Sequence, residues 1–238
     1  MIAYCIDSAL AEVYVVFKGW TPMTDIFFTH EIWRLILGGL QTTMVIFVFA
    51  AIFGVLIAAG LTYLNINRQW PWLYKPLTWF VQMIRNIPAV ALMMFFYYVI
   101  FAGEMNGIVV TIIALGVYTS GMMVDLFTLH IIQVDKGQIE AGMSLGLTKR
   151  QCYHYIVIPQ AAKSMLPLFL SELLSLLLAT SYAGYIAQED LMKVVDAIRE
   201  QHNDAFTSLI IVSALYLALS WIITVIVNSL FVKLFKHD

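Results

Sequence analysis

Long apolar stretches separated by short polar segments dominate the pattern of the chain. A membrane-spanning helix needs about 20 mostly apolar residues, at a rise of about 1.5 Å per residue. Five stretches reach that length, at residues 36–64, 76–101, 107–131, 161–185 and 205–232. The pattern therefore predicts an all-α integral membrane protein with about five transmembrane helices.

The first 31 residues interrupt this pattern with charged side chains and a proline. Asp7, Glu12, Lys18, Pro22 and Asp25 divide the apolar positions into runs too short to span comfortably. We interpret residues 1–31 as an extracytoplasmic, interfacial segment whose aromatic side chains lie at headgroup level. Residues 32–238 then form the transmembrane domain. A further span at residues 2–17 remains the alternative.

The basic residues predict how the helices are oriented, because cytoplasmic loops carry an excess of Lys and Arg. One set of connections holds eight such residues and the opposite set holds four. The larger set is Arg68, Lys75, Lys136, Lys149, Arg150, Lys163, Lys233 and Lys236. This asymmetry predicts an N-terminus outside the cell and a cytoplasmic C-terminus.

Composition supports a membrane protein and argues against a nucleic-acid partner. Hydrophobic residues make up 61% of the chain and charged residues 12%, with a mean hydropathy of +0.85. Soluble domains carry about 25% charged residues, so this chain has too few to cover a globular surface in water. The net charge of −2 provides no basic field for phosphates.

The predicted cytoplasmic connection, at about residues 133–160, is long and amphipathic, and loops of that length are usually functional. Asp135 can cap a short helix, Gly146 can end it, and Thr148 can cap a second helix. We expect Pro159 to close that second helix. Ile139, Met143 and Leu147 form one apolar stripe on the first.

Small side chains along the first helix suit close approach to another protein. Ala141, Gly142 and Gly146 lie on one side, so the helix can enter a groove on a partner. An interfacial elbow packed against lipid headgroups fits the same residues.

This connection resembles the EAA loop of bacterial ABC importer permeases. Glu140, Ala141 and Gly142 stand at the Glu-Ala-Ala positions, with Gly146 and Pro159 at the later glycine and proline. The segments 39–43 and 85–88 and the pair Thr180-Ser181 are similar to motifs of the polar amino-acid branch. The resemblance covers roughly residues 38–232. Gly142, where the motif has alanine, Asp125, where many relatives have glutamate, and Leu178, where many have lysine, depart from the pattern.

The resemblance implies the fold of a type I ABC importer permease in a bacterial inner membrane. It implies a second permease subunit (the same chain or a paralogue), a cytoplasmic ATPase dimer and an extracytoplasmic amino-acid-binding protein. The loop helices of this family dock into the ATPase. The coupling residues would be Glu140, Ala141, Gly142, Gly146, Lys149 and Pro159.

No GxxxxGK[ST] phosphate loop occurs in the chain, so ATP-Mg would be used by the partner and no cofactor bound here. The five histidines show no metal-binding spacing, and no nucleophile–base arrangement is visible. We therefore expect no enzyme activity and no metal site. An integral membrane enzyme and a gradient-driven secondary transporter are the alternatives.

Ionisable residues at membrane depth are costly, and each is a candidate for the substrate pathway. Arg85 and Glu172 can bind the charged groups of an amino acid, or they can neutralise each other. Asp125 is a further candidate, though a structural role fits it better. Pro88 is expected to bend its span. The predicted pathway residues are Arg85, Pro88, Glu172, Ser175, Thr180 and Ser181. They do not distinguish glutamate, glutamine, arginine, histidine and cystine.

Overall fold

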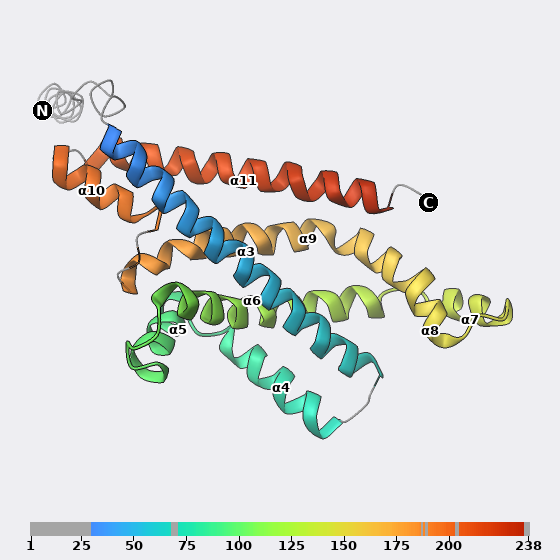
Figure 1. The fold of residues 1–238 in the computed structure, drawn as a ribbon. Helices are drawn as coiled ribbons and strands as arrows, with labels where there is room; N and C mark the ends of the chain where they lie inside the picture. The colour runs from blue at the N-terminus through green and yellow to red at the C-terminus, as the bar shows by residue number, and fades with distance from the viewer. Residues whose placement is uncertain (1–29, 68–70, 187, 189, 203–204, 236–238) are drawn as a thin grey trace, which may run out of the picture.

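The computed structural model describes residues 30–67, 71–186, 188, 190–202 and 205–235. This part of the chain consists of helices and short turns, without a strand (Figure 1). The predicted interfacial segment at residues 1–31 lies almost wholly outside the described residues.

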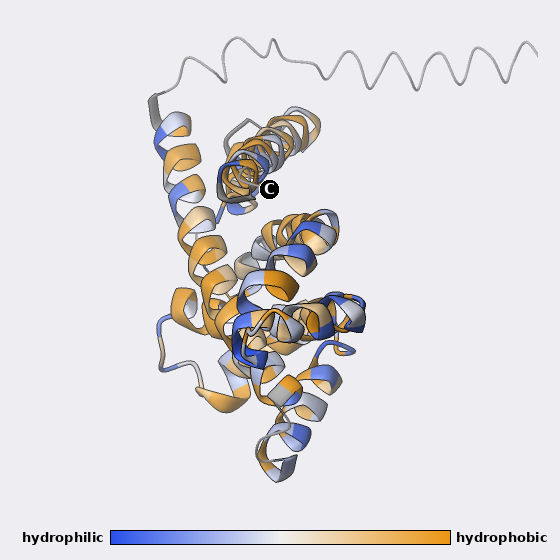
Figure 2. Cartoon of the chain, turned by 90° about the vertical axis from the view of Figure 1, so that its right-hand side faces the viewer, coloured by the Kyte–Doolittle hydropathy of each residue, from blue (hydrophilic) through white to orange (hydrophobic). Residues whose placement is uncertain are grey.

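Four long apolar helices confirm four of the predicted spans. They are α3 (His30–Asn67), α6 (Gly107–Ile132), α9 (Ile158–Ala179) and α11 (Ala205–Phe235). Each is long and apolar enough to cross a membrane. Most of their residues are apolar (Figure 2), as expected where lipid is the solvent.

The remaining predicted span, at residues 76–101, is broken. Helix α4 (Pro71–Ile84) is followed by α5 (Ala89–Phe95), which continues as the π-helical turn η1 (Phe96–Ile100). The two halves meet at an angle of 112°. The described residues thus contain four candidate spans, or five when the bent pair is counted as one.

Pro88 causes the break. It has no N–H to donate, and its ring disfavours the helical conformation of the residue before it. Pro88 takes extended angles, φ −52° and ψ 130°, and stands at the N-cap of α5. The predicted bend is confirmed, although it is a break in the helix rather than a kink.

Helix α6 lies at the centre of the bundle, between α3 and α9. Of its apolar span, 61% is buried, against 22% for α11. Helices α3 and α6 approach closely because each has a glycine at their crossing. A Cβ on Gly54 would lie 2.9 Å from the carbonyl oxygen of Gly116. Small residues at such crossings allow packing without a hydrophobic driving force between helices.

At one end of the bundle, the segment before α10 (Lys193–His202) is docked on α3. The backbone N–H of Leu191 donates to Thr43 Oγ1 at 3.1 Å. A Cβ on Gly39 would lie 2.9 Å from the carbonyl oxygen of Asp190, so only glycine fits there. Asp190 itself is buried, with 1% of its surface exposed.

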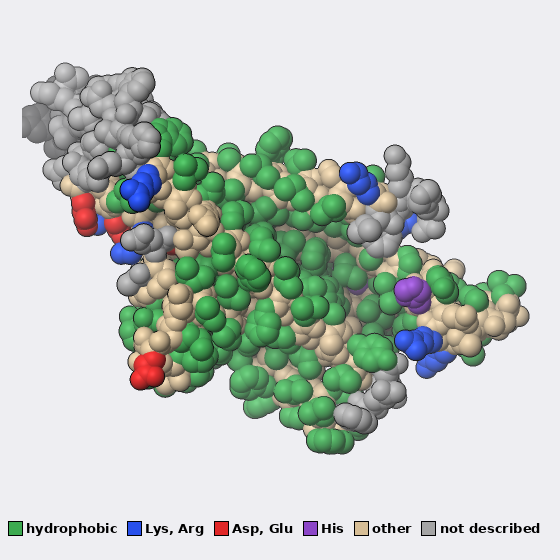
Figure 3. Space-filling model, viewed as in Figure 1, with side chains coloured by type: hydrophobic (Ala, Val, Ile, Leu, Met, Phe, Trp, Pro, Cys, Tyr) green, Lys and Arg blue, Asp and Glu red, His purple; other side chains and the backbone are tan. Residues whose placement is uncertain are grey.

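The ends of the bundle differ in the side chains they present. Acidic side chains gather at the end that carries α10, on the left of Figure 3. The loop helices α7 (Lys136–Ser144) and α8 (Lys149–Cys152) lie at the other end, together with the end of α11 (Figure 1). The predicted topology requires this common end, and which end faces the cytoplasm stays a prediction.

Candidate functional site

The connection between α6 and α9 begins with a capped helix. The Oδ1 atom of Asp135 accepts a hydrogen bond of 2.9 Å from the backbone N–H of Gly137. This bond satisfies one of the free N–H groups at the start of α7. The predicted N-cap is confirmed.

Two backbone hydrogen bonds end α7 in a Schellman motif. The N–H of Leu147 donates to the carbonyl of Gly142 at 3.1 Å, and that of Gly146 donates to Met143 at 3.0 Å. Gly146 has φ +89°, which a residue with a side chain rarely adopts. The prediction that Gly146 ends the helix is confirmed.

A capping box begins the next helix, as predicted for Thr148. Its hydroxyl accepts from the backbone N–H of Gln151 at 3.3 Å. The Gln151 side chain in turn accepts from the backbone N–H of Thr148 at 2.8 Å. Adjacent stop and start signals fix the angle between α7 and α8.

Helices α7 and α8 and the turn between them form an elbow at residues 135–152. Gly142 lies inside this elbow rather than on its outer surface. A Cβ there would lie 2.8 Å from Cδ1 of Ile156 and 2.9 Å from Sγ of Cys152. Cys152 is fully buried, and its thiol lies 3.7 Å from the carbonyl oxygen of Ile139. The second alanine of the motif is a glycine here because the next helix occupies the space of a methyl group.

The outer surface of the elbow carries exposed apolar side chains. Leu145 is 86% exposed and Met143 is 51% exposed, while Ala141 and Glu140 are also exposed. No described residue pairs with the carboxylate of Glu140. The predicted apolar stripe is therefore divided, since its other members are half-buried and Met143 points outward. Leu145 was not among the predicted residues.

Pro159 does not close the second helix, which corrects the prediction. The chain stays helical from Lys149 to Ile186. The π-helical turn η2 (Tyr153–Val157) directly precedes α9, and Pro159 is the second residue of α9, in its first turn. A π-turn widens the helix, and the first turn tolerates a residue without N–H. The elbow is thus continuous with the helix that carries Glu172.

A second candidate site lies where α4 ends, beside α6 and α9. Arg85 forms an ion pair with Asp125 through its NH1 atom. Gln82 donates to the other oxygen of Asp125 at 2.6 Å. Arg85 and Asp125 are each about one-third exposed, with 36% and 31% of their side chains accessible.

Glu172 faces the same site, but its carboxylate has no ion-pair or hydrogen-bond partner among the described residues. It lines a cavity of about 360 Å³ together with Arg85, Asn86 and Met122. The ion-pair partner of Arg85 in the structure is Asp125 and not Glu172, although Arg85 is close enough to attract the Glu172 carboxylate electrostatically. Whether Asp125 has only a structural role stays a prediction.

The remaining predicted pathway residues do not gather at this cavity. Ser175 is exposed and donates to its own helix, at the carbonyl of Ser171. Thr180 is buried and bonds to the carbonyl of Leu177. Ser181 lies on the 3₁₀ turn η3 (Thr180–Ile186) and bonds to Leu178 at 2.7 Å. Pro88 is exposed at the break in the helix.

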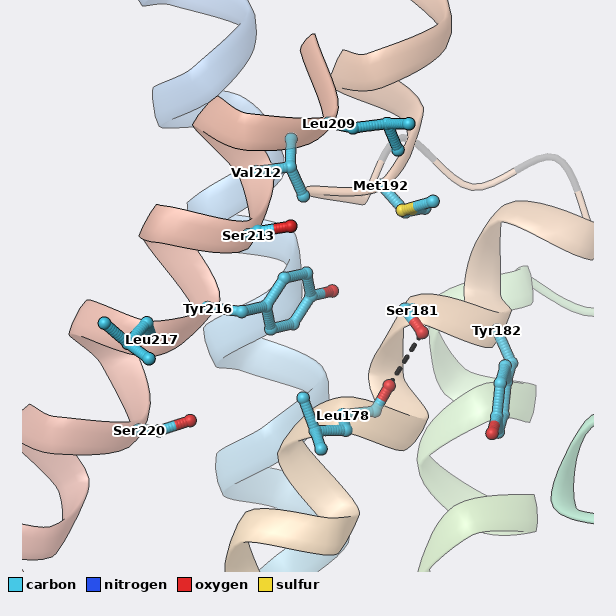
Figure 4. A pocket seen from close by; sticks show the side chains of 10 residues that line it. All are labelled: Leu178, Ser181, Tyr182, Met192, Leu209, Val212, Ser213, Tyr216, Leu217 and Ser220. Atoms are coloured by element: carbon cyan, nitrogen blue, oxygen red, sulfur yellow. Dashed lines mark hydrogen bonds between the residues drawn. The ribbon is translucent and has the colours of Figure 1, made fainter. Parts of the chain in front are cut away.

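Ser181 instead lines a second cavity, of about 540 Å³, between α9, η3 and α11. Figure 4 shows Tyr216 reaching from α11 toward it, with Met192 above and Tyr182 opposite. The residues from α11 could not be found in the sequence, because its uniform hydrophobicity marks no face. In the described part of the chain, no three His, Cys, Asp or Glu residues lie close enough to hold a metal ion.

Comparison with known proteins identifies the family. Residues 50–237 match the family described as binding-protein-dependent transport system inner membrane component. The chain belongs to this family. The permease is therefore a membrane component of a transport system and not an enzyme, as the sequence predicted.

Named relatives and solved structures agree with this assignment. The permease is 34% identical to a probable glutamine ABC transporter permease protein, GlnM of Bacillus subtilis, over 68% of this chain and 78% of that protein. It is 23% identical to the glutamate/aspartate import permease GltK of Escherichia coli O157:H7, over 82% and 91%.

The permease also has the fold of solved ABC transporters. A crystal structure of an amino acid ABC transporter with histidines matches with a TM-score of 0.75 at 23% identity, covering 85% of this chain and 95% of that one. The inward-facing MetNI methionine transporter matches with a TM-score of 0.69 at 18% identity, covering 85% and 97%.

Proposed function

We propose that this permease forms the membrane pathway for polar amino acids in an ATP-binding-cassette importer of the bacterial inner membrane. Its relatives are named for glutamine, glutamate/aspartate and histidine/lysine/arginine/ornithine transport, which supports an amino-acid substrate. A cytoplasmic ATPase dimer, a second permease subunit and an extracytoplasmic binding protein complete the system. ATP-Mg is bound and hydrolysed by the ATPase.

The observation that carries the coupling proposal is the shape of the elbow at residues 135–152. Capped and glycine-terminated helices hold it rigid, and its tip exposes Leu145 and Met143 to solvent. Burial by a partner of an apolar side chain that is 86% exposed outside the bundle stabilises the complex with that partner. Glu140 and Ala141 stand beside the tip, and Lys149 lies at the start of the second helix.

Continuity between the elbow and α9 provides the route for coupling. The helix from Lys149 to Ile186 carries Glu172, Ser175 and Ser181. Lys149 and Glu172 are 23 positions apart, or about 35 Å along such a helix. An ATPase that binds the elbow differently in its two states therefore displaces the side chains of the pathway. Pro159 allows the π-turn that joins the two parts, and Gly142 lets α7 seat on them.

Affinity purification from native membranes in mild detergent tests this proposal. The expected result is an ATPase in near-stoichiometric amount, lost when Leu145→Arg or Glu140→Arg is introduced. Met105→Arg is the matched control, since Met105 is an exposed apolar residue in the loop at the opposite end of the bundle. A chain that purifies without an ATPase, or that retains it equally in all variants, contradicts the coupling proposal.

A further inference from the structure

The ion pair between Arg85 and Asp125 determines the net charge that a substrate meets in the cavity beside Glu172. Asp125 already neutralises the guanidinium of Arg85, and Gln82 bonds to the second oxygen of the carboxylate. Arg85 therefore cannot serve as a free positive charge. Of the three ionisable side chains at this site, Glu172, on the wall of the same cavity, is the one without an ion-pair partner in the described structure.

The three ionisable groups at this site thus carry a formal charge of −1, from two carboxylates and one guanidinium. Glu172 is half-buried and opens into the cavity, so water can solvate it in the empty state. A substrate that fills about 360 Å³ displaces that water. Leaving a net charge uncompensated at membrane depth then costs several kcal/mol.

We propose that this cavity selects amino acids whose side chain is positively charged, and excludes those with an acidic side chain. The inference rests on the proposed function and narrows its substrate class. The ammonium and carboxylate that every amino acid carries sum to zero, so the side chain decides the total. With a cationic side chain the net charge of the occupied site is zero, with a neutral side chain it is −1, and with an acidic side chain it is −2.

The cavity has partners for each end of such a substrate. The Glu172 carboxylate accepts hydrogen bonds from an ammonium or guanidinium group. Arg85 uses NH1 for Asp125, and its other N–H groups remain to donate to the substrate carboxylate. Asn86 donates to the backbone carbonyl of Gln82 at 3.1 Å, which fixes its amide beside Arg85.

Direct binding to the purified permease–ATPase complex, without the binding protein, tests the inference. Tritiated arginine is the probe, and unlabelled arginine, glutamine and glutamate compete with it. We expect affinity to fall in that order, with arginine favoured over glutamate by at least about tenfold, which corresponds to about 1.4 kcal/mol. Glutamate that binds as tightly as arginine overturns the inference.

Charge variants separate selectivity from a structural role. Glu172→Gln brings the net charge of the cluster to zero and should weaken arginine binding by about tenfold. Glutamine no longer leaves a net charge at the site, so it should bind at least as tightly as to the wild type. Glu104→Gln, the same change on an exposed loop residue outside the spans, should alter neither. An equal loss for both ligands in Glu172→Gln contradicts selection by charge. ATP-driven uptake with a preference for glutamate contradicts only this inference. A complete lack of ATP-driven amino-acid uptake contradicts the proposed function as well.

Discussion

At the scale of single residues, Gly142 links a departure from the family motif to a packing constraint. Its missing side chain makes room for Ile156 and Cys152 of the following helix. The sequence shows that the position is small but not why, because the reason lies on another helix. Leu145 is similar: its exposure depends on the direction in which Gly146 turns the chain.

Gly142→Ala should destabilise the elbow. Overpacking costs about 1–3 kcal/mol, and the better helix propensity of alanine returns at most about 1 kcal/mol. Ile156→Val removes Cδ1, the atom closest to the added methyl group, and should restore much of the loss in the double variant. Thermal unfolding of the purified complex measures both effects. An alanine variant as stable as the wild type would contradict this packing.

The pair of Arg85 and Asp125 should show a modest coupling energy. Each side chain is about one-third exposed, which places the pair between surface and buried ion pairs. A double-mutant cycle with Arg85→Gln and Asp125→Asn should give a coupling of about 1 kcal/mol in unfolding experiments. A value near zero would mean that the pair does not form in the membrane.

At the scale of elements, two glycines with positive φ offer a matched comparison. Gly146 (φ +89°) ends α7, while Gly103 (φ +75°) lies in the turn after η1 at the other end of the bundle. Open space surrounds both in the described structure, so alanine costs each about 1–2 kcal/mol through the backbone alone. Only Gly146→Ala should reduce ATPase co-purification. Equal retention in both variants would show that the geometry of the elbow is not needed for coupling.

The docking of the segment 190–202 on α3 should depend on pH through Asp190. Burial raises the pKa of its carboxyl from 3.8 to about 6, although bonds from the backbone N–H groups around Lys193 oppose the shift. Among the described residues, Lys193 and, on α11, Tyr216 are the ionisable groups around it. The docked state then holds a proton that the undocked state releases. Docking is strongest below about pH 4 and weakens as the pH rises through 6.

Hydrogen exchange of residues 190–202 checks this dependence. Protection should be greater at pH 5 than at pH 7.5 after correction for the intrinsic exchange rates. Asp190→Asn should remove the difference, because an amide does not titrate. Unchanged dependence in that variant would assign the effect to another group.

The sequence predicted the elements that depend on local signals. The long helices follow from hydropathy, and Asp135, Gly146 and Thr148 fixed the caps of the loop as expected. The prediction that Pro159 ends the helix was wrong because a π-turn before α9 lets the helix continue past it, and no residue pattern signals a π-turn. The partner of Arg85 could not be predicted, since it depends on how α4 and α6 pack across 40 positions of sequence.

At the scale of the whole molecule, a continuous helix joins the end that we propose binds the ATPase to the cavity that we propose binds the substrate. The exposed tip and the cavity beside Glu172 are both placed by the segment Lys149–Ile186. In the proposed function, this continuity lets ATP binding by the partner ATPase act on the cavity. Uptake should therefore require the elbow as well as the cavity.

Amino-acid uptake into proteoliposomes that contain the complex of permease and ATPase, with the binding protein on the opposite side of the membrane from the ATPase, tests this account most directly. Uptake of tritiated arginine should require ATP on the side of the ATPase and persist when ionophores abolish proton and sodium gradients. Leu145→Arg should abolish it, while Met105→Arg should not. Uptake by the permease alone, driven by an ion gradient and unaffected by Leu145→Arg, would contradict the account and identify a gradient-driven carrier.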